Sequence, residues 1–265
     1  ILTFKPVVQI SARRQDGGGG MIHETTDASW GTRNRPVIFI KLITVSIFPL
    51  IRQISLRVSP LLIRLPISAN QVTTASFLAG GGACWYLAKG TYETTLVGAL
   101  LFLLCYILDN SDGEVARAKN QCSEFGEKYD TFVDWVVHAG FFACLGWGVA
   151  QETGQNLWLW LGLFGAAGGS INYFIGIYMD SRFRRQLGKE YDSTGRSHHE
   201  AHPAPKEVKQ WAVFILREMS RADFCFIVLF LALFDVTWFL LPTAAVGAHV
   251  YWMTQFFRGA RDYHV

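Results

Sequence analysis

The sequence predicts an all-α integral membrane protein with six transmembrane helices, preceded by an amphipathic helix at the membrane interface. Of its 265 residues, 51% are hydrophobic. Three stretches contain no charged residue, namely 65–88, 153–179 and 236–257. Each is long enough to cross a hydrocarbon core of about 30 Å, which takes roughly 20 residues. Soluble proteins seldom bury several helices of this kind, so the pattern indicates a multi-pass membrane protein.

The first 35 residues are polar and contain four consecutive glycines, Gly17–Gly20. They show no apolar period, so residues 1–35 are expected to be a disordered N-terminal segment. Met21 directly follows the glycines. Residues 1–20 are therefore compatible with an extension from an upstream domain.

Residues 36–66 are apolar but interrupted by four cations. These charges disfavour a transmembrane span over this segment. The cations are Lys41, Arg52, Arg57 and Arg64. The pattern predicts an amphipathic juxtamembrane helix whose Lys and Arg side chains reach lipid headgroups. Pro49 and Pro60 are expected to break or kink it.

A domain of six transmembrane helices is expected over residues 67–258, followed by a cytoplasmic tail at 259–265. The spans are predicted near 69–88, 94–117, 130–150, 157–180, 221–235 and 237–257. The fifth is the shortest, because its uncharged core covers only Phe224–Phe234. Glycines at 80–82 and in 165–169 predict faces where helices approach closely.

The placement of the cations predicts the orientation in the membrane. If Asp109–Asp134 faces the cytoplasm, Lys89 is the one residue among 24 Lys and Arg that lies on the far side. Lys and Arg are enriched in cytoplasmic loops. The sequence therefore predicts an active site at the cytoplasmic face, with the lipid bilayer as a partner. No basic stripe with interleaved aromatic residues is present, so no nucleic-acid partner is expected.

Four aspartates lie where apolar segments begin and end. Asp109 and Asp112 stand at i, i+3, and Asp130 and Asp134 stand at i, i+4 on the next helix. A carboxylate at mid-bilayer costs about 2.5–3.5 kcal/mol, so such a cluster needs compensation. Divalent cations, Mg²⁺ or Mn²⁺ and two in number, would supply it. The alternatives are an inter-helix polar network and an ion pathway. Glu124 and Lys128, between the pairs, are expected in a solvated loop.

Small residues accompany the aspartates on the same helical faces. They are Gly113, Ala116 and Gly126. Small side chains at these positions leave space for a bulky ligand. A solvated acidic run would not alternate with Gly and Ala at helical spacing.

The full pattern is D-x-x-D-G-x-x-A-R, eight residues, then G-x-x-x-D-x-x-x-D, from Asp109 to Asp134. It resembles the signature of the CDP-alcohol phosphotransferases, with every position and spacing met. The resemblance covers roughly residues 36–258. It implies a magnesium-dependent transferase of phospholipid synthesis, which is expected to be a homodimer. Such an enzyme moves a substituted phosphate from a CDP-linked donor to a hydroxyl and releases CMP.

The resemblance also implies roles for single residues. Asp109, Asp112 and Asp130 match metal ligands, and Asp134 matches both a shared ligand and the general base. Gly113, Ala116, Arg117 and Gly126 match the nucleotide site, with Arg117 reaching phosphate. A weaker match at residues 65–73 adds Asn70 and Thr73 to that site, although the family usually has Pro where this chain has Ala69. The alternative for Asn70 and Thr73 is a helix cap and its neighbour.

The acceptor is the least determined part of the prediction. Arg182, Arg185 and Arg221 would form an anion pocket for a phosphorylated acceptor if they turned inward, or else only contact headgroups. His138 lies one turn beyond Asp134. It is expected to orient that base, to touch the acceptor, or to be a core histidine with its hydrogen bonds satisfied.

Three functional readings follow. The first is transfer from CDP-diacylglycerol to an acceptor alcohol such as an inositol phosphate. The second has a soluble donor of the CDP-inositol, CDP-choline or CDP-ethanolamine type and a lipid or inositol acceptor. The third is a non-enzymatic transporter or channel with a carboxylate cation site, which would not need the Gly, Ala and Arg positions of the motif.

Overall fold

The computed structural model describes residues 50–187 and 223–262, and this part of the chain folds into helices without a β-strand. The predicted all-α class is therefore confirmed for these residues. The segment 1–35 and the start of the juxtamembrane segment lie outside them. The helices are α2 (Leu50–Arg64), α3 (Ala69–Leu87), α4 (Tyr92–Ala118), α5 (Glu124–Thr153), α6 (Leu157–Leu187), α8 (Phe224–Leu233), the 3₁₀ helix η3 (Thr237–Phe239) and α9 (Leu240–Asp262).

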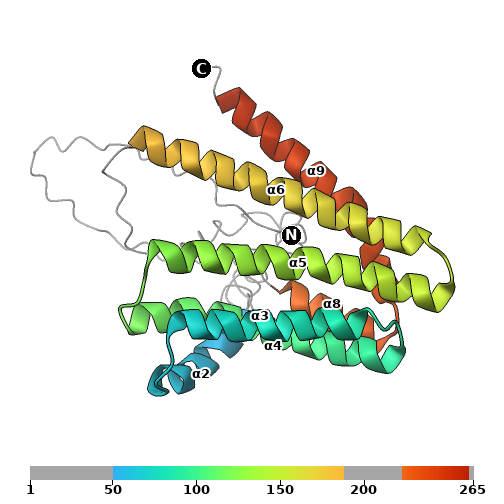
Figure 1. The fold of residues 1–265 in the computed structure, drawn as a ribbon, viewed down its shortest axis with the longest axis horizontal. Helices are drawn as coiled ribbons and strands as arrows, with labels where there is room; N and C mark the ends of the chain where they lie inside the picture. The colour runs from blue at the N-terminus through green and yellow to red at the C-terminus, as the bar shows by residue number, and fades with distance from the viewer. Residues whose placement is uncertain (1–49, 188–222, 263–265) are drawn as a thin grey trace, which may run out of the picture.

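The helices α3 to α6 lie side by side, and each runs opposite to the one before it (Figure 1). Helix α3 packs on α4 and α5, α6 packs on α5 and α9, and α8 packs on α4. The link 119–123 joins α4 to α5 at one end of the bundle, which we call the aspartate end. The links 88–91, 154–156 and 234–236 lie at the other end, which we call the opposite end.

Three helices are long and apolar enough to cross a membrane: α4, α5 and the part of α6 over Leu157–Met179. The chain is a membrane protein. Helix α8 has ten residues, which at 1.5 Å per residue span about 15 Å, half of a typical hydrocarbon core. It corresponds to the predicted fifth span, whose shortness was visible in the sequence. The count of six spans stays a prediction.

Some helix boundaries differ from the predicted ones because helices continue beyond their apolar cores. Helix α5 begins at Glu124 rather than near residue 130, since the Ser123 hydroxyl caps it by accepting from the Gly126 amide at 3.1 Å. Glu124 and Lys128 are therefore helical, and they form an exposed ion pair of 2.7 Å. The prediction of a loop for them was wrong, whereas their predicted exposure to solvent is confirmed. Helices α6 and α9 likewise continue to Leu187 and Asp262.

The juxtamembrane helix α2 packs against α4 at the aspartate end. It passes through Pro60 without ending there, so the expected break does not occur at that residue. Its first turn contains no acidic residue. Instead, the fully buried carboxylate of Asp223 accepts from the amides of Leu50 and Ile51, at 2.9 Å each. The start of α2 is thus joined to the start of α8.

Aromatic side chains fill the core between α4, α5 and α8. Phe102 stacks on Phe141 with ring centroids 4.5 Å apart, and Phe224 meets both rings edge-on. Glycine allows the close helix contacts that were predicted: a Cβ at Gly80 would lie 2.6 Å from Val137, and one at Gly168 would lie 2.8 Å from Ala248. The Phe102–Phe141 contact joins α4 to α5, and the glycine contacts join α3 to α5 and α6 to α9.

Candidate active site

Three carboxylates converge at the aspartate end of the bundle. Asp109 and Asp112 come from α4 and Asp130 comes from α5, and one oxygen of each lies within 4.8 Å of the others. The five-residue link 119–123 forces the two helices to run antiparallel, which brings these faces together. Asp112 is 5% exposed, and the other two are partly buried. A set of carboxylate oxygens suits a hard divalent cation such as Mg²⁺.

Thr73 on α3 holds one of these carboxylates in place. Its hydroxyl donates to Oδ2 of Asp112, and Thr73 itself is 3% exposed. A hydrogen bond from a buried hydroxyl fixes the orientation of a metal-binding carboxylate. Thr73 therefore lies at the site, in contact with Asp112, where the sequence had suggested a nucleotide contact.

Asp134 lies outside the group of three and is engaged by His138. Oδ1 of Asp134 is 2.9 Å from Nδ1 of His138, which is also 2.8 Å from the Asp134 carbonyl oxygen. On the other side of the ring, Nε2 lies 2.7 Å from the hydroxyl of Tyr106. Both neighbours of Nδ1 are oxygens that only accept, so Nδ1 carries a proton and donates to Asp134.

This geometry fits two of the roles predicted for His138, the orientation of Asp134 and a core histidine with its hydrogen bonds satisfied. Tyr106 was missed by sequence reasoning. A signal existed, because Tyr106 precedes Asp109 by three residues and so shares its helical face. The three side chains Tyr106, His138 and Asp134 form a hydrogen-bonded chain from α4 to α5.

The N-terminus of α3 borders the site. Ser68 is the N-cap, and it forms a capping box with Gln71. The alternative that Asn70 and Thr73 are a cap and its neighbour was therefore wrong. Asn70 instead lies over the start of α5, because a Cβ at Gly126 would be 3.1 Å from its Oδ1.

Two side chains near the α4–α5 link hold the turn between α2 and α3. Lys119 donates to the carbonyls of Leu65 and Ile67 at 2.7 and 2.6 Å. Gln121 accepts from the amide of Ala69 at 2.9 Å, a bond that a proline at that position could not make. Neither residue lies at a position of the motif, so no sequence pattern pointed to it.

Space is left along α4 next to the aspartates. A Cβ at Gly113 would meet, within 4 Å, only the guanidinium of Arg117, with Nη1 at 3.3 Å. Arg117 is exposed and Ala116 is partly buried. Beside them, Glu114 accepts from the hydroxyl of Ser55 at 3.2 Å, which ties α2 to this part of α4. A ligand at Gly113 would thus displace only a flexible side chain.

The predicted acceptor residues are only partly described. Arg182 and Arg185 belong to the last turns of α6, but their side chains lie outside the described part of the chain, as does the whole of Arg221. An anion pocket formed by the three arginines stays a prediction.

The fold and the site define an all-helical membrane protein with a carboxylate centre between two antiparallel helices. Residues 66–179 match the family model of the CDP-alcohol phosphatidyltransferases. The matched segment covers α3, α4, α5 and most of α6, and with them all four aspartates. Over this segment, which makes up 114 of its 265 residues, the chain is similar to this family.

Curated relatives support this similarity. A bifunctional IPC transferase and DIPP synthase of Aquifex aeolicus is 32% identical over 115 residues, which are 43% of this chain and 26% of that protein. Proteins with the same name from Thermococcus kodakarensis and Archaeoglobus fulgidus are each 33% identical, over 117 and 94 residues. Those matches cover 44% and 36% of this chain, and 25% and 18% of the relatives. The chain thus spans about a quarter or less of the length of the relatives it matches.

Proposed function

We propose that this protein transfers a substituted phosphate from a CDP-linked donor to the hydroxyl of an alcohol and releases CMP. The observation that carries the proposal is the convergence of Asp109, Asp112 and Asp130 within the segment that matches the family. CDP-diacylglycerol is the proposed donor and an inositol phosphate the proposed acceptor. The site is proposed to face the cytoplasm, and the protein to act as a homodimer.

The three converging carboxylates would hold one or two divalent ions, Mg²⁺ or Mn²⁺, with Asp134 as a further ligand. Such ions neutralise the pyrophosphate of the donor and the departing CMP. Thr73 supports this role, because its hydrogen bond orients Asp112. Every donor atom in the group is a carboxylate oxygen, which suits these hard ions better than softer ones.

The protein's own side chains would perform the proton transfer and the positioning. The acceptor oxygen forms the new bond to phosphorus, the bond from phosphorus to the CMP oxygen breaks, and Asp134 takes the acceptor's proton. His138 would hold Asp134 in the orientation that this transfer requires. Gly113 and Ala116 would leave room for the nucleotide, which Asn70 and Gly126 would border, and Arg117 would contact phosphate.

A second candidate is a soluble CDP-alcohol donor, of the CDP-inositol type, with an inositol or lipid acceptor. The observation that favours it is that the relatives are named for an IPC transferase and a DIPP synthase, and not for a phosphatidyltransferase. Arg182, Arg185 and Arg221 are the proposed contacts for a phosphorylated acceptor in either case.

The experiment is an assay of CMP release by the purified full chain in Mg²⁺. CDP-diacylglycerol, CDP-inositol, CDP-choline and CDP-ethanolamine are each tested with and without inositol phosphate, inositol or diacylglycerol. We expect CMP only when a matching donor and acceptor are both present, and none in excess chelator. If no donor yields CMP and the protein instead conducts divalent cations in liposomes, the transporter reading replaces the enzyme.

Asp109→Asn and Asp112→Asn should abolish the reaction. Removing a charged ligand forfeits several kcal/mol of charge stabilisation, which corresponds to a loss of turnover of about 10³-fold or more. Glu124→Gln is the matched control, because Glu124 is an exposed carboxylate of α5 that pairs with Lys128. Binding of Mn²⁺, followed by its paramagnetic resonance, should weaken in the two aspartate variants and not in the control. Full activity of either variant would contradict the metal site.

A further inference from the structure

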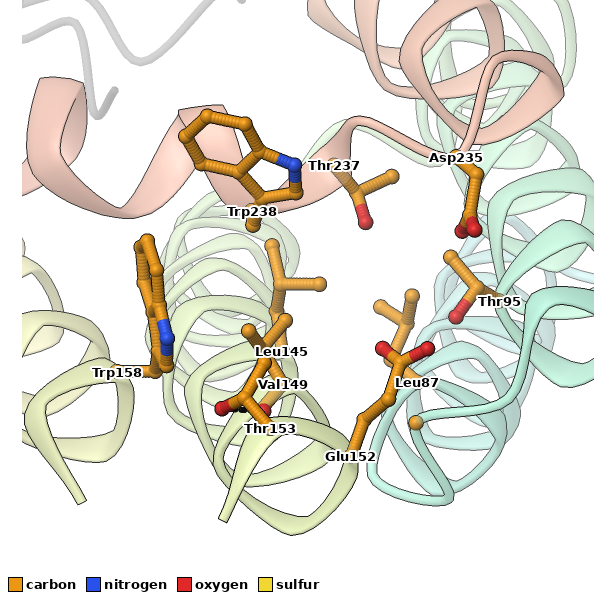
Figure 2. Close-up of a pocket in the computed structure, with 11 residues that line it drawn as sticks. Leu87, Thr95, Leu145, Val149, Glu152, Thr153, Trp158, Asp235, Thr237 and Trp238 are labelled. Carbon is orange, nitrogen blue, oxygen red and sulfur yellow. Dashed lines mark hydrogen bonds between the residues drawn. The ribbon is translucent and has the colours of Figure 1, made fainter. Parts of the chain in front are cut away.

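A second polar site lies at the opposite end of the bundle. A cavity of about 330 Å³ opens there between the ends of α3 and α5, the starts of α4 and α6, and η3 (Figure 2). Thr95 on its wall precedes Asp112 by 17 residues on α4, which at 1.5 Å per residue is about 25 Å. The cavity is therefore separate from the aspartate end.

Two buried hydroxyls turn into this cavity. Thr95 and Thr237 are each 5% exposed, and in Figure 2 both side chains point into the space between the helices. Neither hydroxyl has a hydrogen-bond partner within residues 50–187 and 223–262. Other buried hydroxyls of the bundle, such as those of Ser76 and Ser111, bond to backbone carbonyls. Both hydroxyls face the open space of the cavity, where they can bond to water or to an occupant that forms hydrogen bonds.

The mouth of the cavity carries negative charge. Glu152 at the end of α5 and Asp235 before η3 are both exposed, and both line it. In the described part of the chain, the charged residues of this end are these two, Glu93 and Lys89. The ammonium of Lys89 lies over the ring of Tyr86, 4.9 Å from its centroid, rather than on a carboxylate. The charge at the mouth therefore favours a cation.

The size and chemistry of the cavity narrow the class of cation. Its volume suits a small organic group, whereas a bare divalent ion needs oxygen ligands within about 2.6 Å on most sides. Besides the two indoles, the polar side chains of the lining are two carboxylates and three threonine hydroxyls, one of which, that of Thr153, donates to the Val149 carbonyl. All five groups can accept, and a primary ammonium brings three N–H donors. The indoles of Trp158 and Trp238 line the same space, with centroids 5.7 Å apart, and aromatic faces attract organic cations.

We propose that this cavity binds a primary alkylammonium group. The ammonium would lie between Glu152 and Asp235 and donate to the hydroxyls of Thr95 and Thr237, while its carbon chain contacts the indoles. Such a group occurs in free amines and in the headgroups of amino-phospholipids, and the chemistry of recognition is the same for both. The proposal does not depend on the reaction at the aspartate end.

The test measures binding to the purified full chain in detergent, by saturation-transfer NMR for soluble probes and by native mass spectrometry for lipids. The soluble probes are ethanolamine and its trimethylated analogue choline, and the lipids are phosphatidylethanolamine and phosphatidylcholine. We expect the primary amine to bind at least fivefold more tightly than its trimethylated analogue in one or both pairs. Binding of ethanolamine alone identifies a free amine as the ligand, and binding of the lipid alone identifies the headgroup.

Two paired variants locate the site. Thr95→Val/Thr237→Val removes the hydroxyls without changing shape. Glu152→Gln/Asp235→Asn removes the charges, and Asn tolerates the positive φ of 58° at position 235. Each pair should weaken binding at least tenfold, while Glu93→Gln, a carboxylate of the same end outside the cavity, should leave it unchanged.

Three results would overturn the proposal. They are equal binding of the amine and its trimethylated analogue, unchanged binding in both paired variants, and binding of Ca²⁺ but of no amine. The last would make this end a metal site.

Discussion

The two ends of the bundle both carry carboxylates, but they arrange them differently. At the aspartate end, three carboxylates lie within 4.8 Å of one another, and one of them is held by a buried hydroxyl. At the opposite end, two exposed carboxylates flank a cavity. The hydroxyls of Thr95 and Thr237 in its wall have no hydrogen-bond partner in the described part of the chain. The first arrangement concentrates negative charge on a point, and the second spreads acceptors around a space.

The difference separates the kinds of ligand that the two ends suit. Crowded carboxylates repel one another and need a compact, highly charged ion. Spaced acceptors around about 330 Å³ suit an organic group with several donors. Substitutions that act on one end and spare the other therefore test this division.

Asp134→Asn is expected to have the largest effect on the aspartate end while it spares the opposite end. As the base, Asp134 must take a proton, so its loss should reduce turnover by about 10²–10⁴-fold. Metal and donor binding should stay within a few-fold, because Asp134 lies outside the group of three. Single-turnover rates and donor titrations on the same variant measure both effects. If metal and donor affinity collapse together with the rate, Asp134 is chiefly a ligand, and His138 is the next candidate for the base.

Gly113→Leu should block the nucleotide while the protein stays folded. The atoms nearest to a Cβ at Gly113 belong to the Arg117 guanidinium, with Nη1 at 3.3 Å, so we expect the fold to tolerate a side chain there, whereas a ligand would lose its space. Overpacking of about 1–3 kcal/mol corresponds to donor affinity lower by about 5–150-fold. Gly81→Leu is the matched control, because a Cβ there meets nothing within 4 Å. Normal donor binding by Gly113→Leu would assign this glycine to packing alone.

Gly90→Ala should damage the opposite end. Gly90 has φ of +76°, and a Cβ would lie 2.9 Å from the carbonyl carbon of Gly148. The left-handed backbone alone costs about 1–2 kcal/mol, and the clash adds to it. We expect a melting temperature lower by about 5 °C or more, with CMP release per folded molecule unchanged. Gly154→Ala is the control, because Gly154 has a similar φ of +68° but open space around a Cβ. The smaller decrease in its melting temperature measures the cost of the left-handed backbone alone. Equal decreases in melting temperature in both variants would show that Gly148 moves away from the new Cβ without an energetic cost.

The smallest effect is expected for Tyr106→Phe, which removes the hydrogen bond to Nε2 of His138. One neutral hydrogen bond contributes about 1 kcal/mol, so turnover should fall about fivefold, without a change in metal affinity. In a His138→Gln background the same substitution should have no further effect, because the two act through one chain. Tyr129→Phe, which loses a hydrogen bond to Thr74, serves as the control. Additive losses would show that Tyr106 does not act through His138.

The sequence predicted the aspartate end well because its residues lie on two consecutive helices. Helical periodicity determines which side chains share a face, and the short link leaves only an antiparallel pair. Asp109, Asp112 and Asp130 therefore meet as expected. The start of α5 was misplaced because an apolar span was taken as the helix, whereas the Ser123 cap begins the helix outside that span.

The cavity at the opposite end could not be predicted in this way. Its lining comes from several segments that are far apart in the chain. Thr95 and Thr237 look like ordinary threonines near helix starts, and only the packed structure reveals that their hydroxyls are buried. Helical periodicity places Tyr106 on the same face as Asp109, but its partner His138 is on another helix. Contacts of that kind depend on packing angles that periodicity does not supply.

The bond between Asp223 and the start of α2 has a consequence for the order of assembly. The carboxylate that caps α2 follows Leu50 by 173 residues in the chain. At a synthesis rate of about 5–20 residues per second, it emerges roughly 10–35 s after the helix that it caps. During that interval the first amides of α2 must bond to water or lipid headgroups instead. The helix that borders the aspartate end therefore reaches its final attachment only after α3 to α6 have been made, so the site is completed late in biosynthesis.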